Sequence, residues 1–308
     1  VDGACEAWAC VQAPEATRKG LSDLLKIPFD KVTVNVTLLG GGFGRKSKPD
    51  FVFEAGLLSQ AMDGRPVKMV WTREDDLSHG YLNTTMVSRV EAGLDAEGLP
   101  VALLYRTAAP SITSIFQPDM LHEAAFELGM GAVDMPFAVP NLRVENPEAA
   151  AHTRIGWFRS VYNIPHAFAL QSFVAELAAA AGRDPKDYLL AMLGPDRRID
   201  PTTLSETWNY GEDPALYPID TGRLRQVVEL AAEAGEWGRA LPQGGGLGIA
   251  AHRSFVSYIA VVAEVAVSPQ GAVSVPRVDI AVDCGPVINP DRVRSQMEGA
   301  VVQGLGIA

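Results

Sequence analysis

The chain has 308 residues, with 26 Lys and Arg against 37 Asp and Glu, so its formal charge is −11. A surface this acidic is repelled by a phosphate backbone, which argues against a nucleic-acid partner. Hydrophobic residues make up 47% and charged residues 20% of the sequence, a composition that predicts a folded core and excludes disorder. Three cysteines are too few for a disulfide scaffold or for the ligands of an iron–sulfur cluster.

The ends of the sequence and its apolar runs were compared with targeting and membrane-spanning segments. The first ten residues lack a basic segment followed by an apolar stretch, so no signal peptide is predicted. The longest apolar runs, 173–181 and 259–267, are interrupted by Glu176 and Glu264, which predicts no membrane span. Because the sequence starts without Met and ends on an apolar run, we expect a portion of a longer protein. The compartment stays open.

The first hundred residues are expected to mix strands and helices. Alternating apolar residues predict a strand over 31–39, which is followed by a glycine loop at 40–44. Apolar residues at helical spacing predict a helix over 50–62, and a second strand is expected at 67–71. The acidic run 74–76 could suggest acid catalysis, but after a strand it favours a solvated turn or a helix start.

The remaining sequence predicts an α+β fold of layered sheets and helices. A hairpin is expected over 88–107, and the segment 110–147 is irregular. Further elements are helices over 166–181, 185–193, 221–236 and 291–308 and strands over 257–268 and 272–283. We expect a first domain at 1–194, a linker-like loop at 195–220, and the start of a second subdomain at 221–308.

Two glycine-rich segments could suggest nucleotide binding. A P-loop needs Gly before its Lys-Ser pair, but here Arg45 takes that place. Residues 246–251 fit a loose GxGxxA pattern, yet they lead into a predicted strand, which disfavours a dinucleotide site. The five histidines show no metal-ligand spacing. The loop at 40–44 therefore either exposes backbone N–H groups to an anionic or oxo ligand, or forms a simple tight turn.

Residues 38–46, with the sequence LLGGGFGRK, resemble the molybdenum-cofactor loop of the xanthine oxidase family of molybdenum hydroxylases. Three other segments resemble that family in the same order. These are Cys10–Pro14, which places Gln12 at the family's interval before the loop; Phe158–Val161, before a long helix; and Asp283–Gly306, which contains Gln296. Within the family, the segments GWFRSVYN and WTREDD are most similar to the molybdopterin-binding subunits of isoquinoline- and aldehyde-oxidising members.

This resemblance implies a molybdopterin cytosine dinucleotide cofactor with molybdenum and a small partner subunit that carries two [2Fe–2S] clusters. It also implies hydroxylation of a small N-heteroaromatic compound or an aldehyde with oxygen from water. In that chemistry a metal lowers the pKa of bound water and a glutamate takes up the proton. No counterpart of that glutamate is found, so we expect no catalytic or metal-ligating residue in this chain. Xanthine or aldehyde oxidase-like specificity, and a metal-free interaction domain, are the alternatives.

The resemblance also assigns cofactor contacts. Gln12 is expected to hydrogen-bond a molybdenum oxo group, and Phe43 to offer its backbone N–H near the metal ligands. Arg159 is expected beside the metal through its backbone N–H, and Gln296 at the pterin or its phosphates. Each residue has a structural alternative: strand surface, core plug, salt-bridge partner and polar helix face, respectively. The expected cofactor-binding residues are Gln12, Gly41, Gly42, Phe43, Gly44, Arg159 and Gln296.

Two positions depart from the xanthine-converting members of the family. Ser47 stands where those members have a glutamate, and Val161 stands where they have an aromatic residue. A purine held between an acid and a ring is therefore not expected, and we predict a more open or apolar pocket.

Overall fold

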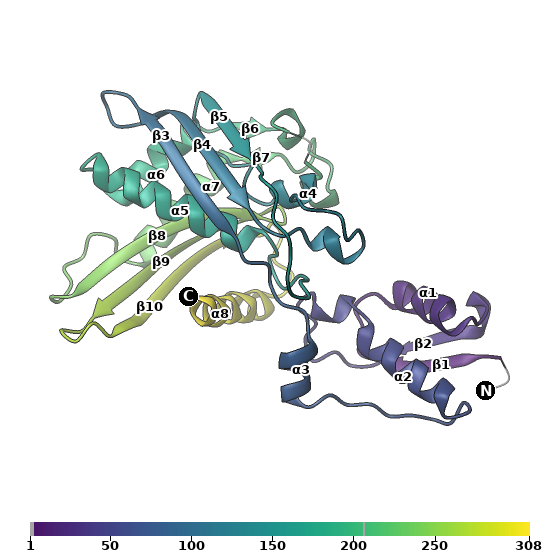
Figure 1. Cartoon of the computed structure of the whole chain (residues 1–308). Coiled ribbons are helices and arrows are strands. Elements are labelled where there is room, and N and C mark those ends of the chain that lie inside the picture. Colours follow the sequence, from purple (N-terminus) through teal and green to yellow (C-terminus); the bar gives the residue numbers. More distant parts are fainter. Residues whose placement is uncertain (1–2, 206) are drawn as a thin grey trace. The chain divides into compact units, whose positions relative to one another are not determined.

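The computed structural model describes residues 3–205 and 207–308 (Figure 1). The chain divides into two compact units, which are described separately. Unit 1 comprises Val1–Thr85, Ile112–Asp119 and Ala150–Val161, and unit 2 comprises Met86–Ser111, Met120–Ala149 and Tyr162–Ala308. The chain therefore passes between the units several times, and residues far apart in sequence complete each of them.

Unit 1 is built on a strand–helix–strand crossover. Strands β1 (Cys5–Ala9) and β2 (Val32–Val36) pair in parallel, with Cys5 opposite Val32, and α1 (Pro14–Leu25) connects them. A parallel pair needs such a crossover, and Pro14 suits the first turn of its helix, where no N–H partner is needed. Helices α1 and α2 (Asp50–Ala61) pack on this sheet around a small apolar core (Figure 1).

The prediction of a strand at 67–71 is wrong. Val67, Met69 and Trp71 alternate with more exposed neighbours as the pattern predicts, but within the described residues this segment pairs with no strand. The acidic run 74–76 lies in the first turn of helix α3 (Arg73–His79), which confirms the expected helix start. Its start is a capping box, in which the Thr72 hydroxyl accepts from the Asp75 N–H and the Asp75 carboxylate accepts from the Thr72 N–H.

Unit 2 contains two three-stranded sheets. The first has the order β10 (Val273–Asp283), β9 (Ser257–Val267) and β8 (Gly245–Ser254), all antiparallel. The second joins β3 (Val87–Leu94), β4 (Pro100–Ala108) and β5 (Asn141–Glu145), with β5 parallel to β4. The α+β fold class is confirmed. Residues 246–251 lie inside β8, so they form no glycine turn before a helix.

Helices fill the space around these sheets (Figure 1). The helices of unit 2 are α4 (Ala125–Leu128), α5 (Asn163–Ala180), α6 (Pro185–Leu193), α7 (Thr221–Ala234) and α8 (Pro290–Ile307). Helix α5 contacts both β3 and β8, and α7 lies across all three strands of the first sheet. The main core lies between α5, α6, α7 and that sheet.

Residues 195–220 include the short pair β6 (Arg198–Ile199) and β7 (Ile219–Asp220). The domain boundary expected at this segment stays a prediction. Among the described residues, no single helix has both the length and the apolar character needed to cross a membrane. Helices α5 and α6 reach that composition only when taken together, across a bend of 114°.

Candidate cofactor site

The glycine-rich loop has a backbone conformation that few side chains tolerate. Gly40, Gly41, Phe43 and Gly44 all have positive φ, at 65°, 110°, 50° and 82°. Within residues 3–205 and 207–308, the backbone N–H groups of 40–43 donate to no acceptor. Successive free N–H groups on such a backbone form an anion-binding nest. The loop can therefore accept an anionic or oxo group without giving up internal hydrogen bonds.

Gln12 lies directly against this loop. Its backbone N–H donates to the carbonyl oxygen of Lys46 at 2.8 Å, and its side-chain Oε1 accepts from the Gly44 N–H at 3.0 Å. A Cβ atom at Gly42 would lie 2.4 Å from the Gln12 side chain, so any larger residue there would displace that side chain from the loop. Because Oε1 is bound by the loop and the side chain is exposed, the amide nitrogen of Gln12 is presented as a donor.

The segment that carries Arg159 reaches the same loop. A Cβ atom at Gly44 would lie 2.9 Å from Trp157 Cδ1 and 3.4 Å from Phe158 Cα. The Trp157 indole Nε1–H donates to Ser47 Oγ at 2.8 Å. Three of the four segments that carry the resemblance therefore meet in unit 1. Gln12 and the backbone before Arg159 both contact the loop that contains Gly41–Gly44.

The backbone after Arg159 is strained. Ser160 and Val161 have φ values of 70° and 51°, and the Val161 N–H donates to the Phe158 carbonyl at 2.9 Å. A β-branched residue at positive φ is a conformational outlier, and such outliers persist where the surrounding structure holds them. The turn that contains Arg159 is thus fixed by its surroundings rather than by local preference.

The charge beside the loop is positive although the chain is acidic overall. Arg45 makes two hydrogen bonds to the Asp50 carboxylate, at 2.8 and 3.0 Å, which neutralises that pair. Lys48 is buried, with its Nζ 3.6 Å from the centroid of the Trp157 ring. Burial lowers the pKa of Lys48 to about 8, with the Arg45 charge acting in the same direction and Asp50 opposing. The Lys48 amine is thus engaged by the ring and the carbonyl oxygen of Trp157.

Gln296 lies elsewhere in the chain. It belongs to α8 in unit 2, where its side chain is exposed. The helix begins at Asn289, whose side chain accepts from the Arg292 N–H. The contact expected between Gln296 and the pterin stays a prediction.

Sequence reasoning did not assign roles to Lys48 and Trp157. Lys48 closes the basic run that follows the loop, which is a weak signal, and Trp157 lies directly before the Arg159 segment. Trp157 contacts Lys48 and Ser47 across 109 and 110 positions of the sequence. Local patterns cannot reveal such contacts.

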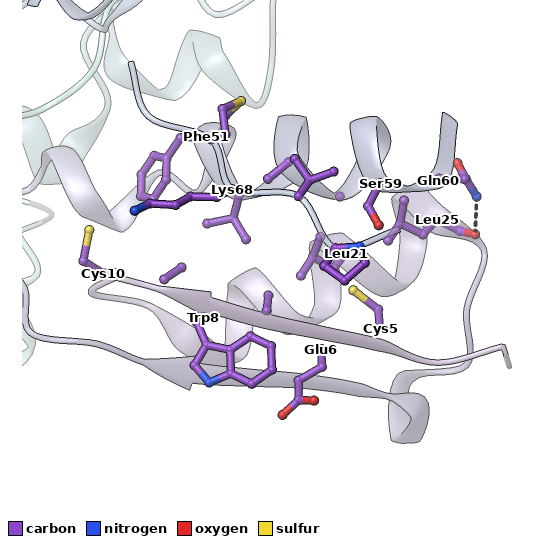
Figure 2. Close-up of a pocket in the computed structure, with 18 of the residues that line it drawn as sticks. Cys5, Glu6, Trp8, Cys10, Leu21, Leu25, Phe51, Ser59, Gln60 and Lys68 are labelled. Atoms are coloured by element: carbon purple, nitrogen blue, oxygen red, sulfur yellow. Dashed lines mark hydrogen bonds between the residues drawn. The ribbon is translucent and has the colours of Figure 1, made fainter. Parts of the chain in front are cut away.

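Unit 1 also contains a groove of about 1830 Å³ beside the loop (Figure 2). Strand β1, helices α1 and α2, and residues 63–73 line it, and Arg45 and Lys46 join it to the end of the loop. Cys5 and Cys10 border the groove, and burial raises the pKa of the Cys5 thiol. None of the expected cofactor-binding residues belongs to its lining.

Residues 1–189 and 227–308 match two families, each described as a molybdopterin cofactor-binding domain. The chain is 30% identical to the beta chain of isoquinoline 1-oxidoreductase from Brevundimonas diminuta, over all of this chain and 37% of that protein. It is also 30% identical to a membrane-bound aldehyde dehydrogenase of Gluconacetobacter polyoxogenes, over 99% of this chain and 40% of that protein. A nicotinate dehydrogenase subunit of Pseudomonas putida is 30% identical over 98% of this chain and 25% of that protein.

Solved structures share the fold. Quinoline 2-oxidoreductase from Pseudomonas putida 86 superposes with a TM-score of 0.56 at 20% identity, covering 87% of this chain and 36% of that one. Aldehyde oxidoreductase from Desulfovibrio gigas gives a TM-score of 0.57 at 15% identity, covering 87% and 29%. The chain thus spans two fifths or less of the length of these relatives.

Proposed function

The chain belongs to the molybdopterin cofactor-binding domains of the xanthine oxidase family, and from that premise we propose that it forms part of the cofactor cradle of a molybdenum hydroxylase. The complete protein hydroxylates small N-heteroaromatic compounds or aldehydes with oxygen from water and passes electrons to a [2Fe–2S] partner subunit. The names of three relatives support this substrate class, since they act on isoquinoline, nicotinate and an aldehyde.

One observation carries the proposal: the Gln12 amide, the free N–H groups of the loop and the Arg159 segment converge in unit 1. These groups are hydrogen-bond donors, as the oxo and phosphate oxygens of a pterin cofactor require. When bound, the cofactor, proposed to be molybdopterin cytosine dinucleotide, supplies a molybdenum centre that accepts electrons from the substrate. The chain itself contributes donors that are held in place before binding.

Preorganisation explains why the loop contains so little side-chain volume. Gly44 fixes Gln12 Oε1 through its own N–H, which leaves the Gln12 amide nitrogen to point outward as a donor. The backbone at Phe43 lies at positive φ between two glycines, so no side chain of its immediate neighbours covers its N–H. Donors that need no rearrangement stabilise a charged ligand more than mobile ones do.

The pocket beside this cradle is proposed to be more open or apolar than one that holds a purine. Ser47, which stands in place of an acid, uses its hydroxyl to bind Trp157 and the loop carbonyl of Gly44. It therefore provides no carboxylate to a purine. Xanthine or aldehyde oxidase-like specificity is the second candidate, supported by weaker matches to xanthine dehydrogenases and aldehyde oxidases.

The test uses the full-length protein produced together with its partner subunit. We expect molybdenum by elemental analysis, cytidine monophosphate after acid hydrolysis, and oxidation of isoquinoline, quinoline or benzaldehyde with an artificial electron acceptor. A protein free of molybdenum would contradict the enzymatic proposal. Fastest turnover of hypoxanthine would contradict our interpretation of Ser47 and Val161.

Gln12→Ala tests the cradle itself. Removing the amide is expected to lower molybdenum content and activity more than thermal stability, because the side chain is exposed. Gln226→Ala, which removes an exposed amide from α7 in unit 2, is the matched control and should leave both unchanged. Equal losses of stability and activity in Gln12→Ala would favour a purely structural role.

A further inference from the structure

Ser47 occupies a bridging position between two segments of unit 1. Its hydroxyl donates to the carbonyl oxygen of Gly44 in the glycine loop. The same oxygen accepts the indole N–H of Trp157 at 2.8 Å. Only a group that is donor and acceptor at once can make both bonds, and among side chains of this size the hydroxyl does so best.

Lys48, the next residue, contacts Trp157 at other groups than Ser47 does. Its Nζ donates to the Trp157 carbonyl at 3.3 Å and lies 3.6 Å from the centroid of the indole ring. The ring of Tyr81 lies 4.9 Å from the same nitrogen. A cation over an aromatic face is held more strongly when it is desolvated, as Lys48 is, than when it is exposed. Trp157 is therefore gripped through its N–H, its ring face and its carbonyl group.

Two glycines make this contact possible. A Cβ atom at Gly156 would lie 2.4 Å from Lys48 Cε, and one at Gly44 would lie 2.9 Å from Trp157 Cδ1. Lys48 is only 5% exposed, so its side chain has little room to move aside. The two segments thus pack at a distance that a single added methyl group would increase.

We propose that Ser47 and Lys48 are positioning residues, which lock Trp157 against the glycine loop and so fix the backbone of Phe158–Val161 relative to Gln12 and Gly44. The inference rests on the proposed function, in which both segments supply donors to one cofactor. It accounts for the strained φ values of Ser160 and Val161, since an anchored Trp157 holds one end of that turn. It also gives Ser47 a task that leaves its hydroxyl committed and unavailable to substrate.

The test compares Ser47→Ala, Ser47→Thr and Lys48→Met in the full-length protein with its partner. We call the contacts of Ser47 and Lys48 with Trp157 the clamp. Hydrogen–deuterium exchange of peptides covering 156–162 measures how firmly the clamp holds this segment, without reference to activity. We expect Ser47→Ala and Lys48→Met to accelerate exchange in these peptides, and Ser47→Thr to match the parent protein. Ser59→Ala is the control, because it removes another hydroxyl–carbonyl bond of unit 1, the one to Arg65, away from Trp157.

Kinetics then separate positioning from substrate contact. Ser47→Ala is expected to lower kcat about tenfold, by the same factor for every substrate oxidised, with KM changed less than about twofold. A change in KM confined to one substrate would show that Ser47 reads the substrate and would overturn the proposal. Unchanged exchange at 156–162, or acceleration throughout unit 1, would also overturn it.

The two proposals fail in different ways. A parent protein without molybdenum contradicts the proposed function. The exchange rate at 156–162 still tests the clamp in that case. If the parent protein contains molybdenum but Ser47→Ala changes neither the exchange rate at 156–162 nor kcat, the clamp is contradicted and the proposed function stands. If Lys48→Met does not fold, the comparison of Ser47→Ala with Ser47→Thr is sufficient to test the clamp.

Discussion

The glycine loop of unit 1 and the helix-covered sheet of unit 2 are ordered by opposite means. In unit 2, side chains from α5, α6, α7, β8 and β9 exclude water from a continuous core. In the loop, Leu38 is 99% exposed and Phe43 is 56% exposed, and positive φ values define the path of the backbone. Apolar burial therefore stabilises unit 2, whereas backbone conformation and a few hydrogen bonds shape the site.

This difference predicts which changes will unfold the protein and which will affect only the site. Truncation of a buried side chain in unit 2 should lower the free energy of unfolding strongly, whereas truncation of the exposed Phe43 side chain in the loop should lower it little. Adding a side chain should cost much in the loop, where glycines allow close approach.

Leu193→Ala should give the largest effect. Leu193 is fully buried in the core of unit 2, and truncation of such a residue costs about 2–5 kcal/mol. Phe43→Ala is the partner change in the loop and should cost less than about 1 kcal/mol, because more than half of that ring is exposed. Urea unfolding of both variants gives the comparison. Similar losses would show that the Phe43 ring has a packing role.

Gly44→Ala and Gly40→Ala should differ although both glycines have positive φ. An alanine at Gly44 meets the Trp157 ring and its carbonyl oxygen at 2.9 and 3.1 Å, whereas one at Gly40 meets nothing within 4 Å. We expect a loss of about 2–3 kcal/mol for Gly44→Ala and about 1 kcal/mol for Gly40→Ala. Urea unfolding measures both values. Equal losses would mean that φ alone decides, and that Trp157 moves aside freely.

Asp134 and His252 should make the stability of unit 2 depend on pH with opposite signs. Burial raises the pKa of Asp134 from 3.8 to about 7, so between these values the folded state binds more protons and stability falls as pH rises. Burial lowers the pKa of His252 from 6.5 to about 4, so between these values stability rises with pH.

Asp134→Asn removes the contribution of Asp134 to stability, which falls as pH rises. Relative to the parent protein, its free energy of unfolding should increase by about 1 kcal/mol between pH 5 and pH 6. Urea unfolding at the two pH values measures the change, and Asp119→Asn, at an exposed carboxylate, serves as the control. An Asp134→Asn variant that follows the parent protein across this range would show that Asp134 is ionised in the folded state.

Ser160→Gly should give the smallest effect, and with the opposite sign. Glycine adopts φ near 70° without the strain that serine bears, so stability should rise by about 0.5–1 kcal/mol. Asp63→Gly, at φ 57° after α2, should rise by a similar amount away from the site. Thermal unfolding compares the two. A loss of stability in Ser160→Gly would show that contacts of the serine side chain outweigh the strain.

Much of the fold could be predicted from periodicity. The helices predicted at 50–62, 166–181, 185–193 and 221–236 correspond to α2, α5, α6 and α7 within a few residues. Helix α1 was not predicted, because only a few apolar residues mark its buried side among polar ones. The strand expected at 67–71 shows the alternating burial but no partner among the described residues, since pairing depends on neighbours that a local pattern does not contain.

The candidate site could be predicted in part. The glycine loop and its distance along the chain from Gln12 indicated the site, and the structure places Gln12 against Gly42 and Gly44. The clamp on Trp157 could not be predicted, because Ser47 and Trp157 lie 110 residues apart and neither has a local signature. The contact expected between Gln296 and the pterin stays a prediction.

The division of unit 1 into three chain segments bears on when the site can form during synthesis. A ribosome that has released the glycine loop has still to make the whole β3–β4 hairpin and strand β5 before Trp157 emerges. Until then the loop lacks its anchor, and closing so long a stretch of chain is entropically costly and slow. Under the proposed function, the cofactor cradle is therefore complete only after the ribosome has made sequences that belong to the other unit.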